Sequence, residues 1–247
     1  MTLVAEEKFT STAPLQSRNH LLTVLPPEEF AQLRLHLTPV RLEAKGRLAE
    51  PNRPIDAVYF PLDAVISVTA VSHDDNSVEV GSVGCEGMAG LPVLFGAVRS
   101  TSRILVQIAG DAERLEASAL HAATERLPVF RRLLLLYAQG FMTQVSQSTA
   151  CNRLHPAEQR LARWLLICRD RVGRDEIPIT HETMAVMLGV RRATVTEAAG
   201  SLQRDGLIRY RRGVVAIADR DRLEAAACEC YGIVREEFDR LLGVRVG

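Results

Sequence analysis

The segment from Ile179 to Ile208 restricts the possible folds of this 247-residue chain more than any other stretch. Thr180 suits a helix N-cap, because its hydroxyl can accept a backbone N–H from the first turn. The spacing after it predicts a helix from Glu182 to Leu188. Gly189 ends that helix, since glycine adopts the left-handed backbone of a tight turn without strain. The residues expected inside are Met184, Ala185 and Leu188.

A second helix is expected after Val190, with arginines at its N-terminal end. The apolar face at helical spacing consists of Val195, Ala198, Ala199 and Leu202. Two short helices about a glycine turn form the arrangement that places a recognition helix in the DNA major groove. Downstream, residues 205–217 predict a hairpin with an arginine-rich tip, a wing. A helical hairpin inside an enzyme is the alternative, and the wing argues against it.

Charge distribution supports this interpretation, although the formal net charge of the whole chain is zero. Residues 153–220 hold 13 basic against 8 acidic side chains, whereas residues 21–120 hold 8 against 13. No apolar run approaches the roughly 20 residues of a membrane span, and the N-terminus lacks the order of a signal peptide. We therefore expect a cytoplasmic protein with no membrane partner.

The rest of the chain predicts an α+β fold. Residues 1–18 show no period and suggest a disordered leader. After a helical stretch, the apolar period changes to two from Pro39 to Glu116, with glycine and proline between short runs, which predicts a jelly-roll β-barrel. The expected units are a leader (1–18), a β-roll (19–126), a long helix (127–153), a winged helix–turn–helix (154–218) and a C-terminal helix (219–247).

The long helix shows a seven-residue repeat over about three heptads. A two-fold DNA-binding protein needs a dimer axis, so we expect the repeat to form a paired seam. A helix packed only on its own barrel is the alternative. The seam residues would be Phe130, Leu134, Tyr137 and Phe141.

The order of an acidic β-roll, a long helix, a helix broken before Pro156 and a winged helix–turn–helix resembles the cyclic-AMP receptor protein / fumarate-nitrate regulator superfamily of bacterial transcription regulators. The resemblance covers roughly residues 20–218 and is best over Ile179 to Ile208. It implies a homodimer on a near-palindromic operator of double-stranded DNA. It also implies contact with RNA polymerase, or its blockage, and a small-molecule effector site in the β-roll.

By this resemblance, Arg192, Thr196 and Glu197 fall where the family's recognition helix meets base edges. Arg192 can donate to guanine O6 and N7, and Glu197 can accept from a cytosine amino group. Ala193 stands where the family often has a base-contacting glutamate, so a different half-site is expected. The expected phosphate contacts, with solvation as the alternative for the wing, are Thr180, His181, Arg191, Thr194, Arg211 and Arg212.

The implied effector pocket departs from the family pattern. Gly87, Met88 and Gly90 stand in place of the glycine-rich segment, followed by Arg99 and Ser100, which could grip an anion. Met88 replaces the ribose-binding glutamate, and a thioether accepts hydrogen bonds poorly. We expect no tight cyclic-AMP binding, and either another anionic effector or none.

No metal, cofactor or catalytic site is predicted. The five cysteines are expected to be reduced thiols, and Cys228-Glu229-Cys230 is too close-set for the usual zinc spacing, so we interpret the pair as small residues on a packed helix. Nucleophile-elbow, P-loop and His-Glu-x-x-His motifs are absent from the sequence. The sequence therefore predicts a dimeric transcription regulator, not an enzyme. The alternatives are a constitutive regulator whose β-roll serves only for dimerisation and protein interaction, and a β-roll metal-binding enzyme.

Overall fold

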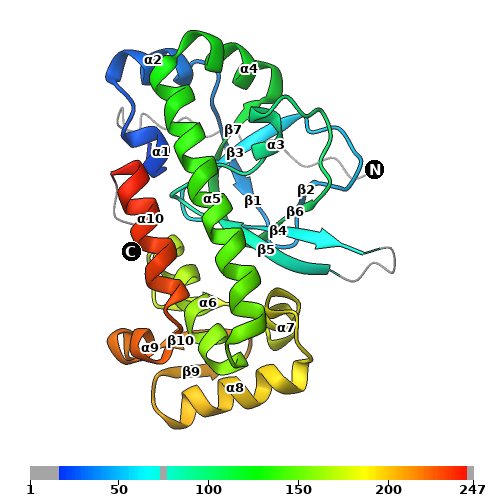
Figure 1. Ribbon diagram of the computed structural model, residues 1–247, viewed down its shortest axis with the longest axis vertical. Helices are drawn as coiled ribbons and strands as arrows, with labels where there is room; N and C mark the ends of the chain where they lie inside the picture. The colour runs from blue at the N-terminus through cyan, green and yellow to red at the C-terminus, as the bar shows by residue number, and fades with distance from the viewer. Residues whose placement is uncertain (1–16, 73–76, 244–247) are drawn as a thin grey trace.

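A computed structural model of the protein describes residues 17–72 and 77–243. Most of the predicted leader, residues 1–16, and the end of the predicted C-terminal unit, residues 244–247, lie outside the described residues. The β-sheets and short helices occupy one end, and a smaller helical unit with a three-stranded sheet occupies the other (Figure 1). Among the described residues, no helix is long and apolar enough to span a membrane.

Two antiparallel sheets form the predicted β-roll. The first has the order β1 (Thr38–Leu42), β7 (Gly110–Glu116), β3 (Ala57–Pro61), and the second has the order β2 (Arg47–Ala49), β6 (Arg103–Ile108), β4 (Val65–Val71), β5 (Ser77–Val83). Alternate side chains point inward, as Val58 and Phe60 of β3 and Ile104 and Val106 of β6 show by sharing one buried core. The jelly-roll prediction is confirmed as two facing sheets, although they do not close into a barrel.

Short helices cover the roll. They are α1 (His20–Thr23), α2 (Pro27–Arg34), α3 (Leu91–Leu94) and α4 (Ala117–Arg126). Pro27 begins α2, where its missing N–H leaves no helical hydrogen bond unmade, and Glu28 and Glu29 follow in the first turn. The Glu29 carboxylate accepts hydrogen bonds from the backbone N–H groups of Val129 and Phe130, at 3.1 and 2.8 Å, so it fixes the start of the long helix.

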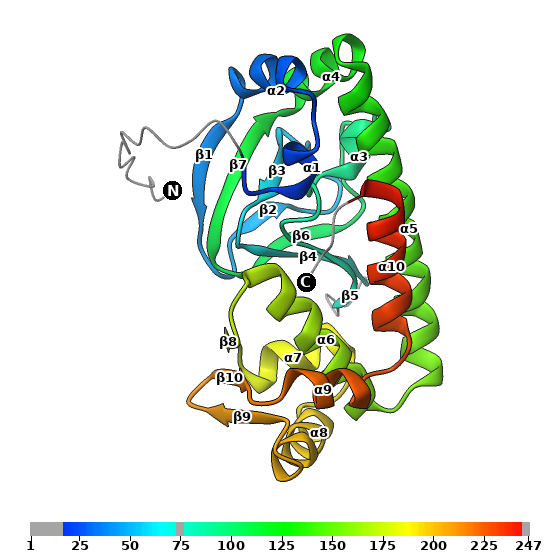
Figure 2. The same ribbon diagram turned by 90° about the vertical axis from the view of Figure 1, so that its left-hand side faces the viewer.

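The long helix α5 (Pro128–Leu154) runs from the β-roll to the helical unit at the other end (Figures 1 and 2). The prediction of a single C-terminal helix is wrong. The chain forms two helices there, α9 (Arg220–Ala226) and α10 (Cys230–Leu242), and Ala227 is extended between them. Helix α10 turns back along α5, and Phe238 stacks on Tyr137 with ring centroids 6.0 Å apart. One face of α5 is therefore covered within the monomer.

The second unit packs around α6 (Ala157–Val172). It contains β8 (Glu176–Pro178), α7 (His181–Leu188), α8 (Arg192–Arg204), β9 (Ile208–Arg211) and β10 (Val214–Ile217), with sheet order β8-β10-β9. His155, in extended conformation, separates α5 from α6, and Pro156 caps α6, as the predicted helix break required.

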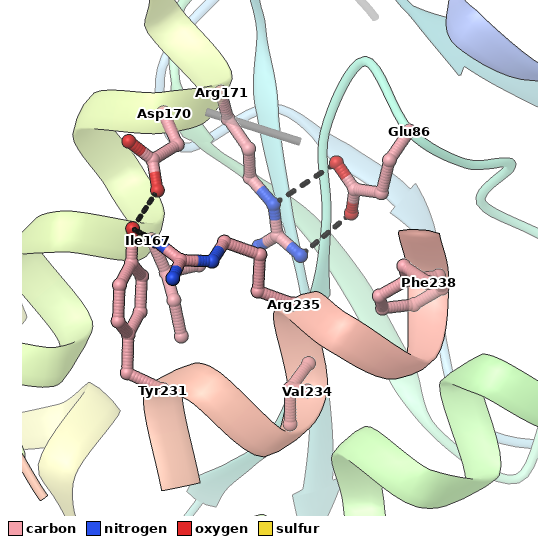
Figure 3. A pocket seen from close by; sticks show the side chains of 8 residues that line it. All are labelled: Glu86, Ile167, Asp170, Arg171, Tyr231, Val234, Arg235 and Phe238. Atoms are coloured by element: carbon pink, nitrogen blue, oxygen red, sulfur yellow. Dashed lines mark hydrogen bonds and ion pairs between the residues drawn. The ribbon is translucent and has the colours of Figure 1, made fainter. Parts of the chain in front are cut away.

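Buried polar contacts fasten α6 to the β-roll. Arg171 forms an ion pair with Glu86, with Nη2–Oε1 and Nε–Oε2 distances of 2.6 and 3.2 Å (Figure 3). About two turns earlier on the same face, the Trp164 indole N–H donates to Glu79 Oε1 over 3.2 Å. Burial raises the pKa of Glu79 to about 7. The two units are thus joined by carboxylates of the roll and side chains of α6.

Candidate DNA-binding surface

The helix–turn–helix has the local geometry that its sequence predicts. Thr180 is the N-cap of α7, and its hydroxyl accepts the backbone N–H of Thr183 over 3.2 Å. Gly189 ends α7 with φ of 60°, in the left-handed region that favours glycine. The predicted apolar residues of both helices are buried in one core with α6. This core fixes α8 and leaves its other face toward solvent.

The exposed face of α8 carries the residues predicted to contact bases. Arg192, Thr196 and Glu197 are all exposed, and Arg191 immediately precedes the helix. Neither Arg191 nor Arg192 forms an ion pair with any residue that the structure describes. Two guanidinium groups at a helix N-terminus, without internal partners, make a surface suited to phosphate and base edges.

His181 holds three elements of this surface together. Its ring stacks on Tyr210 of β9 with centroids 4.2 Å apart, and its Nδ1 lies 3.1 Å from the Thr196 hydroxyl of α8. Because Thr196 donates to the Arg192 carbonyl over 3.1 Å, the His181 Nδ1–H is the donor to Thr196. Burial, and then the charge of Arg192, lower the pKa of His181. His181 is therefore a neutral bridge, and it brings no cation to the surface at neutral pH.

The wing lies beside α8 at the same end of the molecule (Figure 2). The backbone N–H of Tyr210 donates to Gln203 of α8 over 2.8 Å, which ties the hairpin to the helix. Arg212 and Gly213 form the turn with φ of 50° and 79°, the pattern of a two-residue type I′ hairpin. Arg211 and Arg212 are exposed. The wing tip and the start of α8 therefore present four arginines to solvent.

The five predicted effector residues are divided between the buried core and the exposed surface. Met88 is fully buried in the core, and the Tyr137 ring lies where a side chain on Gly87 would stand. Ser100 is buried, and its hydroxyl is bonded to the backbone C=O and N–H of Ser102 at 2.7 and 3.1 Å. Arg99 is exposed. Packed side chains therefore occupy the space beside Gly87 and Met88, which argues against one anion pocket formed by all five residues.

Gly90, the fifth predicted effector residue, has φ of 107° and lies against Val58. A cavity of about 30 Å³ lies between α6, α10 and the loop that carries Glu86 (Figure 3). It has room for about one water molecule, too little for an organic effector.

The predicted seam residues on α5 also have a different role. Phe130, Leu134 and Tyr137 are 1%, 0% and 0% exposed, packed against the roll and α10. Phe141 contacts Tyr137 with ring centroids 6.3 Å apart and lies against Gly81 of β5. The heptad pattern therefore records packing inside the monomer, which was the alternative interpretation. The face that α5 leaves exposed lies one to two residues away from the predicted seam positions.

Contacts across the interface between the two units were missed from the sequence. Two pairs of side chains meet there, Glu79 with Trp164 and Glu86 with Arg171, and the partners in each pair are 85 residues apart in the sequence. The only sequence signal was the spacing of seven residues between Trp164 and Arg171, which places them on one face of a helix.

Comparisons with known proteins agree with this architecture. The sequence pattern of the Crp-like helix-turn-helix domain matches residues 159–226. The transcriptional regulator SdrP of Thermus thermophilus is 27% identical over 182 residues, which cover 70% of this chain and 85% of that protein. The structure of FixK2 from Bradyrhizobium japonicum superposes with a TM-score of 0.67 at 15% identity, covering 78% of this chain and 98% of that one.

A transcriptional regulator of the CRP family, also from Thermus thermophilus, has a similar fold, with a TM-score of 0.63 at 20% identity over 76% of this chain and 96% of that one. These relatives are transcription regulators, in agreement with the expectation that the chain is not an enzyme. The matches show that residues 159–226 form a Crp-like helix-turn-helix domain, and together with the β-roll described above they show that the chain has the fold of the cyclic-AMP receptor protein / fumarate-nitrate regulator superfamily of transcription regulators, which it resembles in sequence.

Proposed function

We propose that this regulator acts in the cytoplasm as a homodimer that binds a near-palindromic operator through α8 and the wing. The observation that supports this most is the group of exposed arginines at the start of α8 and at the wing tip, on one end of the molecule. Bound there, the protein either contacts RNA polymerase or blocks its access.

Arg192 and Glu197 are the proposed base contacts, since both are exposed on the outer face of α8. Thr196 offers its methyl group, because its hydroxyl is already bonded to Arg192 and His181. The proposed phosphate contacts hold the helix in register without specifying sequence. They are Thr180, Arg191, Thr194, Arg211 and Arg212, with His181 supporting them through its stack on Tyr210.

The proposed dimer contact is the exposed face of α5. Exposed residues recur there at alternating spacings of three and four, as in a heptad seam. Leu135 and Met142 are 46% and 62% exposed, which is unusual for large apolar side chains on a helix otherwise well covered. The full stripe is Arg132, Leu135, Gln139, Met142, Ser146, Thr149 and Arg153.

Replacing Leu135 and Met142 together by glutamate should place like charges across this seam and convert the dimer into monomers. Light scattering coupled to size exclusion gives the mass directly. The matched control is Leu35→Glu, at an 83% exposed apolar residue of the β-roll end, which should leave the mass unchanged. A dimer that survives the double substitution would reject this seam.

DNA binding is proposed to need no cyclic nucleotide. Two observations support this proposal: Met88 is fully buried, and the Tyr137 ring packs against Gly87. This favours the constitutive alternative over control by a small anionic effector at Arg99 and Ser100.

The test is selection of genomic DNA fragments by the purified protein without added ligand, followed by titration of the selected site with and without cyclic nucleotides. Recovery of a two-fold-symmetric site, with half-sites about one helical turn apart and affinity unchanged by nucleotide, is the expected result. Failure to select any site without an effector would contradict it.

A further inference from the structure

Four potential metal ligands converge where α5, α6 and the α9–α10 break meet. Cys151 comes from the last turn of α5 and His155 from the residue that follows α5. Cys228 lies in the break, and Cys230 begins α10. One ligand atom from each side chain lies within 4.8 Å of every other. All three cysteines are buried, and none is in a disulfide.

Two of the separations match those around a tetrahedral zinc ion, and the others lie close to them. Zinc–sulfur and zinc–nitrogen bonds of about 2.3 and 2.0 Å place two sulfurs roughly 3.8 Å apart, and sulfur and nitrogen roughly 3.6 Å apart. Here Cys151 Sγ lies 3.5 Å from Cys228 Sγ, and Cys230 Sγ lies 3.7 Å from His155 Nδ1. No pair is more than 4.8 Å apart, so the widest pair would need to close by at most about 1 Å, within the reach of side-chain rotation.

The second nitrogen of His155 has the partner that a metal-bound imidazole needs. Its Nε2 lies 3.1 Å from Glu229 Oε1, and Glu229 stands between two of the cysteines. A carboxylate that accepts Nε2–H leaves the Nδ1 lone pair facing the sulfurs. This carboxylate–histidine arrangement fixes the tautomer and orientation of histidines that bind zinc.

Positive charge lies close enough to balance thiolates. Three thiolates and one zinc ion carry one net negative charge. Arg163 of α6 is near the group, and its Nε and Nη1 are buried without a hydrogen-bond partner among the described residues. Arg160, on the same helix, donates to Asn152 over 2.7 Å beside Cys151. Buried N–H groups of a guanidinium without partners are costly, and an anionic centre beside them would offset that cost.

We propose that Cys151, His155, Cys228 and Cys230 bind one Zn²⁺ as a closed structural site. The four protein ligands leave no open position for substrate, so the site is not catalytic. Its ligands come from sequence positions 77 residues apart, and the ion would fasten the start of α10 to the end of α5. His155 is also the link between α5 and α6, so zinc would fix the junction that orients the DNA-binding unit.

The sequence concealed this site because its two halves lack the usual spacing. Cys228 and Cys230 are separated by one residue, and Cys151 and His155 by three. Neither pair alone indicates a metal site. Only the return of α10 along α5 brings the two pairs together (Figure 2).

The experiment is metal analysis of the untagged full-length protein, purified with reductant and without added metal. Zinc should be present at about one ion per chain, and cobalt substitution should give the thiolate charge-transfer and d–d absorption of a tetrahedral sulfur site. Removing zinc from the wild type with a chelator should lower Tm, and adding zinc back should restore it, a test that needs no variant.

Variants separate this site from general effects of cysteine loss. Cys228→Ser should abolish stoichiometric zinc, and Glu229→Gln should weaken zinc affinity about 10- to 100-fold. The matched control is Cys85→Ser, at a buried free cysteine outside the group, which should retain zinc. Zinc-free reduced protein that takes up neither Zn²⁺ nor Co²⁺ would overturn the proposal. So would a Cys151–Cys228 disulfide found in its place by mass spectrometry, or zinc retained in Cys228→Ser.

Discussion

The ion pair between Glu86 and Arg171 offers the sharpest test of how the two units are joined. The side chains are 1% and 4% exposed, so neither charge can be solvated if its partner is removed. Arg171 also donates to the Ser82 hydroxyl and carbonyl, over 2.5 and 2.8 Å. The Glu86 carboxylate accepts in addition from the backbone N–H of Gly84 over 3.1 Å.

Arg171→Met removes the cation and leaves a buried carboxylate. Breaking one side of such a pair costs roughly 3–5 kcal/mol, and Glu86→Leu should cost a similar amount because it strands the guanidinium. The double substitution removes both charges and leaves the Ser82 hydroxyl and the Gly84 N–H without side-chain partners, while the Ser82 carbonyl keeps its hydrogen bond from Gln144. At about 1–2 kcal/mol for each stranded group, the double variant should lose roughly 2–4 kcal/mol, well below the sum of the single losses.

Trp164 provides the assay, because the chain has a single tryptophan and it lies in the same interface. Urea unfolding followed by its emission gives the free energy of unfolding of all four proteins in the cycle. If the loss of unfolding free energy in the double variant equalled the sum of the losses in the two single variants, the reasoning would be refuted. Such additivity would mean that the two charges do not stabilise each other.

Three further predictions concern DNA contacts and pH. Arg192→Ala should weaken operator binding by roughly 1–3 kcal/mol and relax one base position, measured by anisotropy on a set of single-base operator variants; an unaltered base preference would reject this role. Replacing Arg211 and Arg212 by alanine should reduce the slope of log K against log salt by roughly 2 per monomer, whereas Arg53→Ala, on the β-roll, should leave it unchanged; an unmoved slope in the wing variant means no phosphate contact. The pKa of Glu79 in the folded protein, about 7, lies above its ordinary value of 4.5, so its contribution to the free energy of unfolding is complete below about pH 4.5 and is lost as pH rises through 7, by about 3 kcal/mol. Glu79→Gln should therefore make the free energy of unfolding in urea less dependent on pH over this range. A variant with the same pH profile as the wild type would contradict the pKa shift.

Local signals predicted the helix–turn–helix well. The cap at Thr180, the turn at Gly189 and the apolar spacing of α8 each depend on residues within a few positions, and each was confirmed. The long helix shows where such signals fail. The heptad repeat predicted which residues of α5 are buried. It does not indicate whether they pack against a second chain or against the same chain, as Tyr137 does against Phe238.

Contacts between distant segments could not be predicted from one sequence. The resemblance places Met88 at a ligand-binding position of the family, and only its packing, with Tyr137 beside Gly87, shows that side chains fill the space. Cys151 and Cys228 likewise meet only because the chain breaks between α9 and α10 and reverses. In both places, the deciding information is which segments pack together, and residue spacing does not carry it.

The arginine at the wing tip has a consequence for how this protein's stability and function are balanced. Arg212 adopts φ of 50°, a conformation that costs an ordinary L-residue roughly 1–2 kcal/mol and glycine almost nothing. Arginine at this position thus lowers the stability of the free protein, and its charge contributes favourable energy only in the complex with DNA. Arg212→Gly should make the free protein more stable and its DNA complex weaker, two changes of opposite sign from one substitution.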